Sequence, residues 1–408
     1  MRIVALGLAG WLLLGAGGCA SDVHEPATDR DVQETQIAAM DSDGYQSMVV
    51  GPRRERIAYT VPKDDKRALH FGDRTGRAYE EIAGVVISPD GQRVMYGARN
   101  GDAWRVVIDG KASPRYDGVA ALRFGPRGRR TAYARRRGNQ QRMVVDGEAG
   151  PGFDAVSPAV FSASGRHYAY RGRNGETWAA VVDGKIQATG RDLSLIRFAE
   201  EGERYAYRRA GKKGDRVVVD GETGPAYGLV GEPVLSPDGR RVAYKVVVGV
   251  EERVRVDGAE QPGFNVVDGK SLIFSADGSR LAYVAEREDR WHVVVDGEPG
   301  PAFYDIQRNS LTFSPDGSRL AYVALLEPDI PHAEPKQVAV VDGEAGKPWD
   351  AIDQAMMAFS PDGGHFAYVG EREKKQRMIL DGKPKRKFNF VGEPVFSPDG
   401  RRLAYVAV

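Results

Sequence analysis

Short apolar runs alternate with tight polar turns along most of the chain. Runs such as residues 217–219 and 281–285 carry apolar side chains at successive positions, which is typical of strands buried between two sheets. No stretch keeps an apolar period of 3.6 residues, so the pattern argues against helices as the main element. It predicts an almost entirely β protein.

Two kinds of turn separate these runs. The first is Ser-Pro-Asp-Gly, clearest at residues 314–317, where proline presets φ and glycine accepts the positive φ that follows. The second is Asp-Gly after a β-branched run, which is a strong hairpin signal. It recurs at Asp109, Asp146, Asp183, Asp220, Asp257, Asp296, Asp342 and Asp381, with a degenerate Gly72-Asp73 in the first unit. Two hairpins in each unit predict four strands.

The strand after the first turn ends in a tyrosine that repeats with a nearly constant spacing. The spacing is 37 residues five times, then 39, 39, 46 and 37, for Tyr59, Tyr96, Tyr133, Tyr170, Tyr207, Tyr244, Tyr283, Tyr322, Tyr368 and Tyr405. A period of this length indicates a solenoid or a propeller, and four-stranded units favour a β-propeller.

The repeats amount to nine full units and a two-stranded remnant at residues 394–408. We therefore expect a propeller of about nine to ten blades in one ring, while two tandem propellers or an open array remain alternatives. Residues 35–40 are expected to pair with the remnant and close the ring.

The phrase Phe-Ser-Pro-Asp-Gly-x-Arg-Leu-Ala-Tyr, best preserved at residues 313–322 and 396–405, resembles the WD40-like repeat of TolB-type β-propellers. The resemblance covers about residues 45–408. It implies that the Ser-Pro-Asp-Gly turn joins the two inner strands of a blade and that the Val-Asp-Gly turn joins the two outer strands. It implies no function, because TolB has an additional α/β domain for which this chain leaves no room.

The first residues predict export. Arg2 precedes the apolar stretch 3–15, and small residues at 16–18 lead to Cys19, the only cysteine in the chain. This order is that of a secretory signal, and it resembles a bacterial lipoprotein signal, in which the cysteine is lipidated. We expect a signal peptide at 1–18, a polar tether at 19–34 and a propeller at 35–408. The exported protein is expected to be a membrane-anchored lipoprotein, either periplasmic or at the outer membrane or cell surface. An ordinary secretory signal is the alternative.

Candidate catalytic groups are few. The six histidines have no metal-ligand spacing, and neither a Gly-x-Ser-x-Gly elbow nor a phosphate-binding loop occurs. The repeated aspartates are explained by turn chemistry. The 58 basic and 57 acidic residues give no overall attraction to nucleic acid. We therefore predict no catalytic residue, no metal and no cofactor.

One cluster of charges is not required by the turns. The predicted loops between the second and third strands of three consecutive units carry Arg135, Arg136, Arg137, Arg171, Arg173, Arg208, Arg209, Lys212 and Lys213. Equivalent loops of successive blades lie side by side, so these residues predict a basic sector that binds an anionic partner. A solvated arginine-rich surface is the alternative.

These observations lead to one main hypothesis about function. The chain is predicted to be a monomeric, non-catalytic scaffold, tethered through a lipid on Cys19, that presents the basic sector to an envelope protein or an anionic envelope polymer. The alternative is a glycan lyase or hydrolase with its site in the propeller channel.

Overall fold

The computed structural model describes residues 2–4, 36–39, 48–52, 56–328, 330 and 333–408. Within this part, the regular elements are strands and one short 3-10 helix, η1 (Arg308–Ser310). The chain divides into two compact units, Met1–Gly152 and Phe153–Val408. Cys19 and nearly all of the predicted signal peptide and tether lie outside the described residues.

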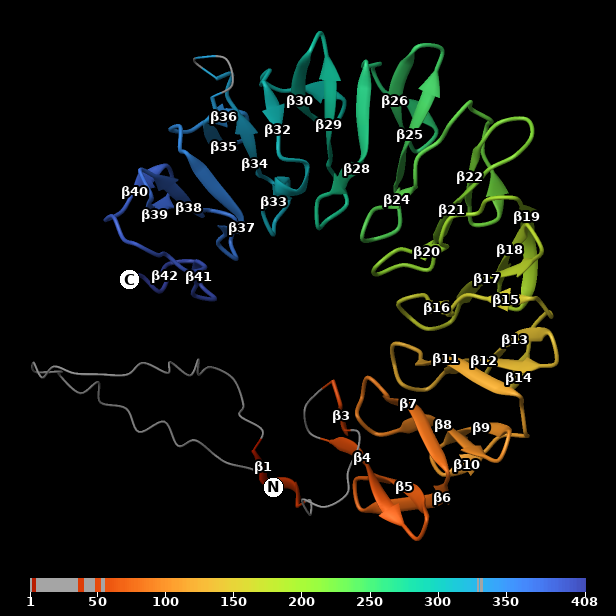
Figure 1. Cartoon of the computed structure of the whole chain (residues 1–408). Helices are drawn as coiled ribbons and strands as arrows, with labels where there is room; N and C mark the ends of the chain where they lie inside the picture. The colour runs from red at the N-terminus through yellow and green to blue at the C-terminus, as the bar shows by residue number, and fades with distance from the viewer. Residues whose placement is uncertain (1, 5–35, 40–47, 53–55, 329, 331–332) are drawn as a thin grey trace, which may run out of the picture. The chain divides into compact units, whose positions relative to one another are not determined.

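Unit 1 contains three four-stranded antiparallel sheets, and each follows the chain order from one edge to the other (Figure 1). Their strands are β3 (Met48–Val50), β4 (Ile57–Lys63), β5 (Lys66–Phe71) and β6 (Arg74–Tyr79); β7 (Glu81–Ile87), β8 (Val94–Asn100), β9 (Ala103–Ile108) and β10 (Lys111–Ala112); and β11 (Gly118–Phe124), β12 (Thr131–Arg137), β13 (Gln140–Val145) and β14 (Glu148–Ala149). A further short pair joins β1 (Arg2–Val4) to β2 (Gln36–Ala39).

Unit 2 contains four four-stranded sheets, two five-stranded sheets and a two-stranded hairpin at the end of the chain order (Figure 1). The first three sheets contain β15 (Ala155–Val156), β16 (Val160–Phe161), β17 (Tyr168–Asn174), β18 (Thr177–Val182) and β19 (Lys185–Gly190); β20 (Arg197–Phe198), β21 (Tyr205–Arg209), β22 (Arg216–Val219) and β23 (Glu222–Thr223); and β24 (Val234–Leu235), β25 (Val242–Val248), β26 (Glu251–Val256) and β27 (Ala259–Glu260). The next three sheets contain β28 (Val266–Phe274), β29 (Leu281–Arg287), β30 (Arg290–Val295) and β31 (Glu298–Pro299); β32 (Asp305–Ile306), β33 (Thr312–Phe313), β34 (Leu320–Leu325), β35 (Gln337–Val341) and β36 (Glu344–Ala345); and β37 (Ala351–Phe359), β38 (Phe366–Arg372), β39 (Lys375–Leu380) and β40 (Lys383–Pro384). The hairpin consists of β41 (Val395–Phe396) and β42 (Leu403–Ala404).

The sheets confirm the predicted repeat. Unit 1 has three blades and unit 2 has six, followed by the two-stranded remnant, and successive strands pair in each blade. In two blades of unit 2 the first strand is interrupted, so β15 and β16 share the partner β17, and β32 and β33 share β34. Repeated four-stranded meanders of this kind are the blades of a β-propeller, and the predicted fold class is confirmed.

The pairing predicted for residues 35–40 is not found among the described strands. Gln36–Ala39 pairs with Arg2–Val4, and the sheet of β41 and β42 contains only these two strands. Residues 36–39 include a single β-branched residue, Ile37, so their own preference for the strand conformation is weak and does not select a partner.

Each Ser-Pro-Asp-Gly turn is held together by its aspartate. In the turn at residues 314–317, Ser314 Oγ donates to Asp316 Oδ1 at 2.5 Å, and the Ser318 amide donates to the same oxygen at 3.2 Å. Gly317 adopts a φ of +73°. In the preceding blade, hydrogen bonds from Ser275 and Ser279 lower the pKa of Asp277 to about 2. The serine and aspartate of the repeat are therefore explained by local turn chemistry.

The aspartate of the second turn takes part in a link that we call the clamp: an arginine, this aspartate and the backbone of the next blade. Asp296 Oδ1 accepts from the Leu281 amide at 2.8 Å, and its Oδ2 lies 3.4 Å from Arg280 Nε. Arg280 Nη1 then donates to the Ser318 carbonyl of the next blade at 2.7 Å. The clamp therefore joins both hairpins of one blade to the blade that follows.

The arginine–aspartate half of the clamp recurs along the chain. It is formed by Arg93 and Asp109, Arg130 and Asp146, Arg204 and Asp220, Arg241 and Asp257, and Arg319 and Asp342. Histidine replaces the arginine in two blades, where His167 bonds Asp183 and His365 bonds Asp381.

Seven of the ten repeated tyrosines lie in apolar cores between successive blades of the same unit. Tyr283 is fully buried in a cluster that contains Phe264 and Leu272, and Tyr322 lies in the next cluster with Phe303. Burial raises the pKa of both tyrosines above the usual value. The constant spacing in the sequence therefore reflects one core position in each blade.

Candidate functional site

Most of the predicted basic residues lie on strands rather than in loops. Arg135, Arg136 and Arg137 end β12, Arg171 and Arg173 lie on β17, and Arg208 and Arg209 end β21, which leaves Lys212 and Lys213 in a loop. The strands continue further than predicted because the hairpins are tight, with Arg137 paired to Gln140 and Asn174 to Thr177. Alternate residues of a strand point to opposite faces, so neighbouring arginines do not form one continuous surface.

The three arginines of unit 1 contact groups of the segment between β10 and β11. The guanidinium groups of Arg135 and Arg137 each lie 5.3 Å from the centre of the Tyr116 ring, which is within the range of a cation–π contact. Arg136 Nη2 donates to the Asp117 carbonyl at 3.1 Å. These contacts hold the three side chains against the blade.

Arg171 and Arg173 share an aromatic neighbour in unit 2. Their guanidinium groups lie 4.7 and 5.6 Å from the centre of a Trp178 ring, and Arg171 Nη1 also donates to the Leu193 carbonyl. Burial lowers the pKa of Arg171, and the nearby carboxylates of Asp192 and Glu232 oppose this shift. The Arg171 side chain is therefore part of the packing between two blades.

Arg208 is paired inside unit 2. Its side chain is 19% exposed and forms ion pairs with Asp192, with Asp215 at 3.6 Å and with Glu232 at 3.4 Å. Burial acts to lower the pKa of Arg208, but hydrogen bonds to Asp192 and Glu232 raise it above the usual value. Three carboxylates therefore already neutralise this predicted binding residue.

Arg209 and Lys212 lie in a different environment, a pocket of about 460 Å³ in unit 2 that we call the basic pocket. It is lined by Thr177, Thr189, Gly190, Arg191, Arg209, Ala210, Gly211 and Lys212. The lining residues include three cations and no carboxylate. Among the described residues, none of these three cations is in an ion pair. Arg191 was not predicted, because a single arginine between strands gives no signal in the sequence.

The basic pocket borders an unusual outer strand. The fourth strand of a blade has two residues in most of the described sheets, but β19 has six. The other six-residue outer strand is β6 in unit 1. It also borders a cationic pocket, of about 700 Å³, whose charged lining residues are Lys63, Arg77, Arg105 and Arg115. Each unit therefore pairs a long outer strand with a cationic pocket.

The described part of the chain contains no group of three or more histidine, cysteine, aspartate or glutamate side chains placed to hold a metal ion. No helix in it is long and apolar enough to span a membrane. His167 and His365 bond the clamp aspartates, and His292 Nδ1 contacts the Gly300 carbonyl at 2.8 Å. These three histidines therefore have structural partners.

Solved structures similar to this chain share little sequence with it. One described as the eukaryotic initiation factor is 12% identical and covers 82% of this chain and 96% of its own, with a TM-score of 0.38. The β-propeller domain of the Trilobed protease from Pyrococcus furiosus is 14% identical and covers 64% of this chain and 97% of its own, with a TM-score of 0.29.

The β-propeller domain of Cps50 (Swd1) from Myceliophteria thermophila is 12% identical and covers 70% of this chain and 94% of its own, with a TM-score of 0.26. No protein-family profile and no curated protein matches the sequence. The fold of this chain therefore follows from its own repeated four-stranded sheets, which are blades of a β-propeller.

Proposed function

We propose that this protein is a non-catalytic propeller scaffold that binds an anionic partner of the cell envelope through the basic pocket. The observation that carries the proposal is that Arg191, Arg209 and Lys212 line one pocket without a carboxylate. Neighbouring like charges repel one another, and an anion bound between them removes this repulsion. Thr177 and Thr189 add hydroxyl groups beside the cations, and hydroxyls donate hydrogen bonds to anionic oxygens.

The first prediction concerns this pocket. The double variant Arg191→Glu, Lys212→Glu is expected to bind poly-glutamate about tenfold more weakly than the wild-type protein at low salt, because two attractive charges become repulsive. Both residues are exposed, so the fold should persist. The measurement is a titration at several salt concentrations, in which the variant should also show a smaller dependence on salt.

A matched variant tests whether position matters. Lys270→Glu with Lys347→Glu makes the same change of charge at two exposed sites of unit 2 that do not line the basic pocket. We expect it to keep most of the affinity. Equal losses in the two double variants would show that only the net charge matters, and would contradict a site at the basic pocket.

The second part of the proposal is a lipid anchor on Cys19, supported by the single cysteine at the end of a signal-like sequence. Two adjoining features of the sequence agree with it, the apolar stretch 3–15 and the small residues at 16–18. The anchor would hold the scaffold at a membrane, where the basic pocket would meet an envelope partner.

The second prediction is that Cys19→Ser moves the protein from the membrane fraction to the soluble fraction of the cells that produce it, because the serine cannot form the thioether to the lipid. Mass spectrometry of the wild-type protein should detect the lipid on its first mature residue. A variant that stays in the membrane fraction, together with a wild-type mass that shows no lipid, would contradict the anchor.

A further inference from the structure

The first blade keeps the arginine of the clamp but not its aspartate. Arg56 stands 37 residues before Arg93, and Gly72 stands 37 residues before Asp109. In the second blade, Asp109 Oδ2 accepts from Arg93 Nε at 2.7 Å and Oδ1 accepts from the Val94 amide at 3.1 Å. Glycine has no side chain that could accept these bonds, so the first blade lacks the carboxylate that the other full blades have.

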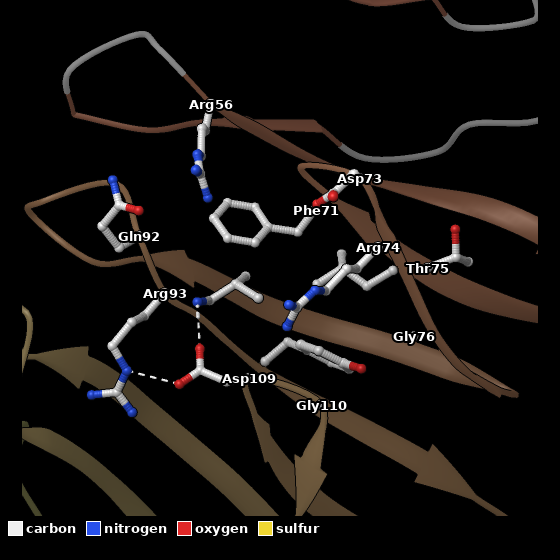
Figure 2. Close-up of a pocket in the computed structure, with 13 residues that line it drawn as sticks. Arg56, Phe71, Asp73, Arg74, Thr75, Gly76, Gln92, Arg93, Asp109 and Gly110 are labelled. Carbon is white, nitrogen blue, oxygen red and sulfur yellow. Dashed lines mark hydrogen bonds and ion pairs between the residues drawn. The ribbon is translucent and has the colours of Figure 1, made fainter.

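A pocket of about 530 Å³ lies at this place in unit 1 (Figure 2). Figure 2 shows Arg56 beside the Phe71 ring and Arg74 entering the pocket from another segment, while Arg93 is directed toward Asp109. The Arg56 guanidinium lies 5.9 Å from the centre of the Phe71 ring. Among the described residues, neither Arg56 nor Arg74 is in an ion pair, so two cations of the pocket are without a paired carboxylate.

The apolar lining residues indicate what kind of anion fits beside the arginines. Leu69, Phe71, Val94 and Tyr96 supply apolar surface. Burial, with a smaller contribution from Tyr79, raises the pKa of Tyr96 to about 12, which agrees with a largely apolar environment around its ring. Guanidinium groups bind carboxylates through paired hydrogen bonds, and pockets of this size hold small molecules. The residues therefore suit a carboxylate that has a small apolar body.

We propose that this pocket of unit 1 binds a small organic carboxylate, whose carboxyl group takes the place that the clamp aspartate holds in the other full blades. Arg56 would bind it as Arg93 binds Asp109, and Arg74 would add a second cation. The inference is independent of the proposed function, because it concerns different residues in the other unit.

The test is to put the missing carboxylate into the chain. Gly72 has a φ of +63°, and the eight clamp aspartates have φ values between 48° and 53°, so Gly72→Asp places aspartate in a backbone conformation that it already adopts elsewhere in this protein. We expect wild-type protein to bind hexanoate saturably in calorimetric titration. Gly72→Asp should bind it at least about tenfold more weakly and unfold at a higher temperature without ligand.

Further variants test which residues are responsible for hexanoate binding and for the change in thermal stability. Arg56→Gln should lose hexanoate binding without the gain in thermal stability, and Gly101→Asp, at a positive-φ turn with open space around it, should keep binding. Asp73→Asn should bind at least as well as the wild-type protein, because Asp73 also lines the pocket and competes for the arginines. Binding only in Asp73→Asn would show that Asp73 fills the site in the natural protein, and would overturn the proposal.

The class of ligand is tested in parallel. Inorganic phosphate and chloride at the same ionic strength should compete poorly with hexanoate, because they lack the apolar body that the pocket accommodates. Tighter binding of phosphate than of hexanoate would overturn the assignment to carboxylates. Equal hexanoate affinity in the wild-type protein and Gly72→Asp, or no saturable binding to the wild-type protein, would overturn the site itself.

Discussion

Tyr283→Ala should destabilise unit 2 by about 3–5 kcal/mol, the range found when a large buried aromatic side chain is removed from a core. Tyr283 is fully buried, and its ring packs edge-on against Phe264 with 6.3 Å between ring centres. The alanine would leave a cavity between two blades that cannot easily close, because β29 is hydrogen-bonded on both sides to β28 and β30. In a repeat array each blade contacts only its neighbours, so the loss of stability should be largest in the blades next to the substitution.

Two further variants serve as controls, one for the burial of the side chain and one for its hydroxyl group. Tyr304→Ala removes the same side chain where it is 46% exposed, and should cost about 0.5 kcal/mol or less. Tyr283→Phe removes only the hydroxyl, which donates to Gln261 Oε1 at 3.1 Å, and should cost about 1 kcal/mol. The measurement is urea unfolding combined with hydrogen exchange of β28 to β30. Similar costs for Tyr283→Ala and Tyr304→Ala would contradict a core role for the repeated tyrosine.

The second large effect is expected at a turn glycine that touches the preceding blade. Gly363 has a φ of +72°, and a Cβ atom there would lie 2.6 Å from Asp316 Oδ1. Asp316 cannot easily move away, because Ser314 and Ser318 hold its carboxylate. Gly363→Ala therefore combines backbone strain with a steric clash between two blades.

A glycine in the same blade provides the control. Gly382 also has a φ of +72°, but no atom lies within 4 Å of the place where its Cβ would be. Gly382→Ala should show only the backbone strain, about 1–2 kcal/mol, and Gly363→Ala should cost clearly more in urea unfolding. Adding Asp316→Ala to Gly363→Ala should restore part of the loss. If the two glycine variants cost the same, the turns of successive blades are not in firm contact.

The sequence alone determined the repeated unit. Proline, aspartate and glycine set the turns through local backbone preferences, and the tyrosine spacing gave nine four-stranded units, which the sheets confirm. These features are local, so they can be recognised without knowing what packs against them. The sequence predicted the environment of the basic residues less well than it predicted the blades. Arg209 and Lys212 line the basic pocket, whereas Arg208 is paired with three carboxylates.

Contacts between segments far apart in the chain were decided only by the tertiary structure. The spacing between Arg280 and Asp296 is visible in the sequence, but the bond from Arg280 to the Ser318 carbonyl depends on how two blades stack. In the same way, Gly72 is a visible departure from the repeat, yet a departure in a turn does not by itself indicate a pocket. The pocket exists because several separate segments surround the place where the carboxylate is missing. Local preferences therefore determine the blades, and packing between blades determines which charges are paired in the described part of the chain.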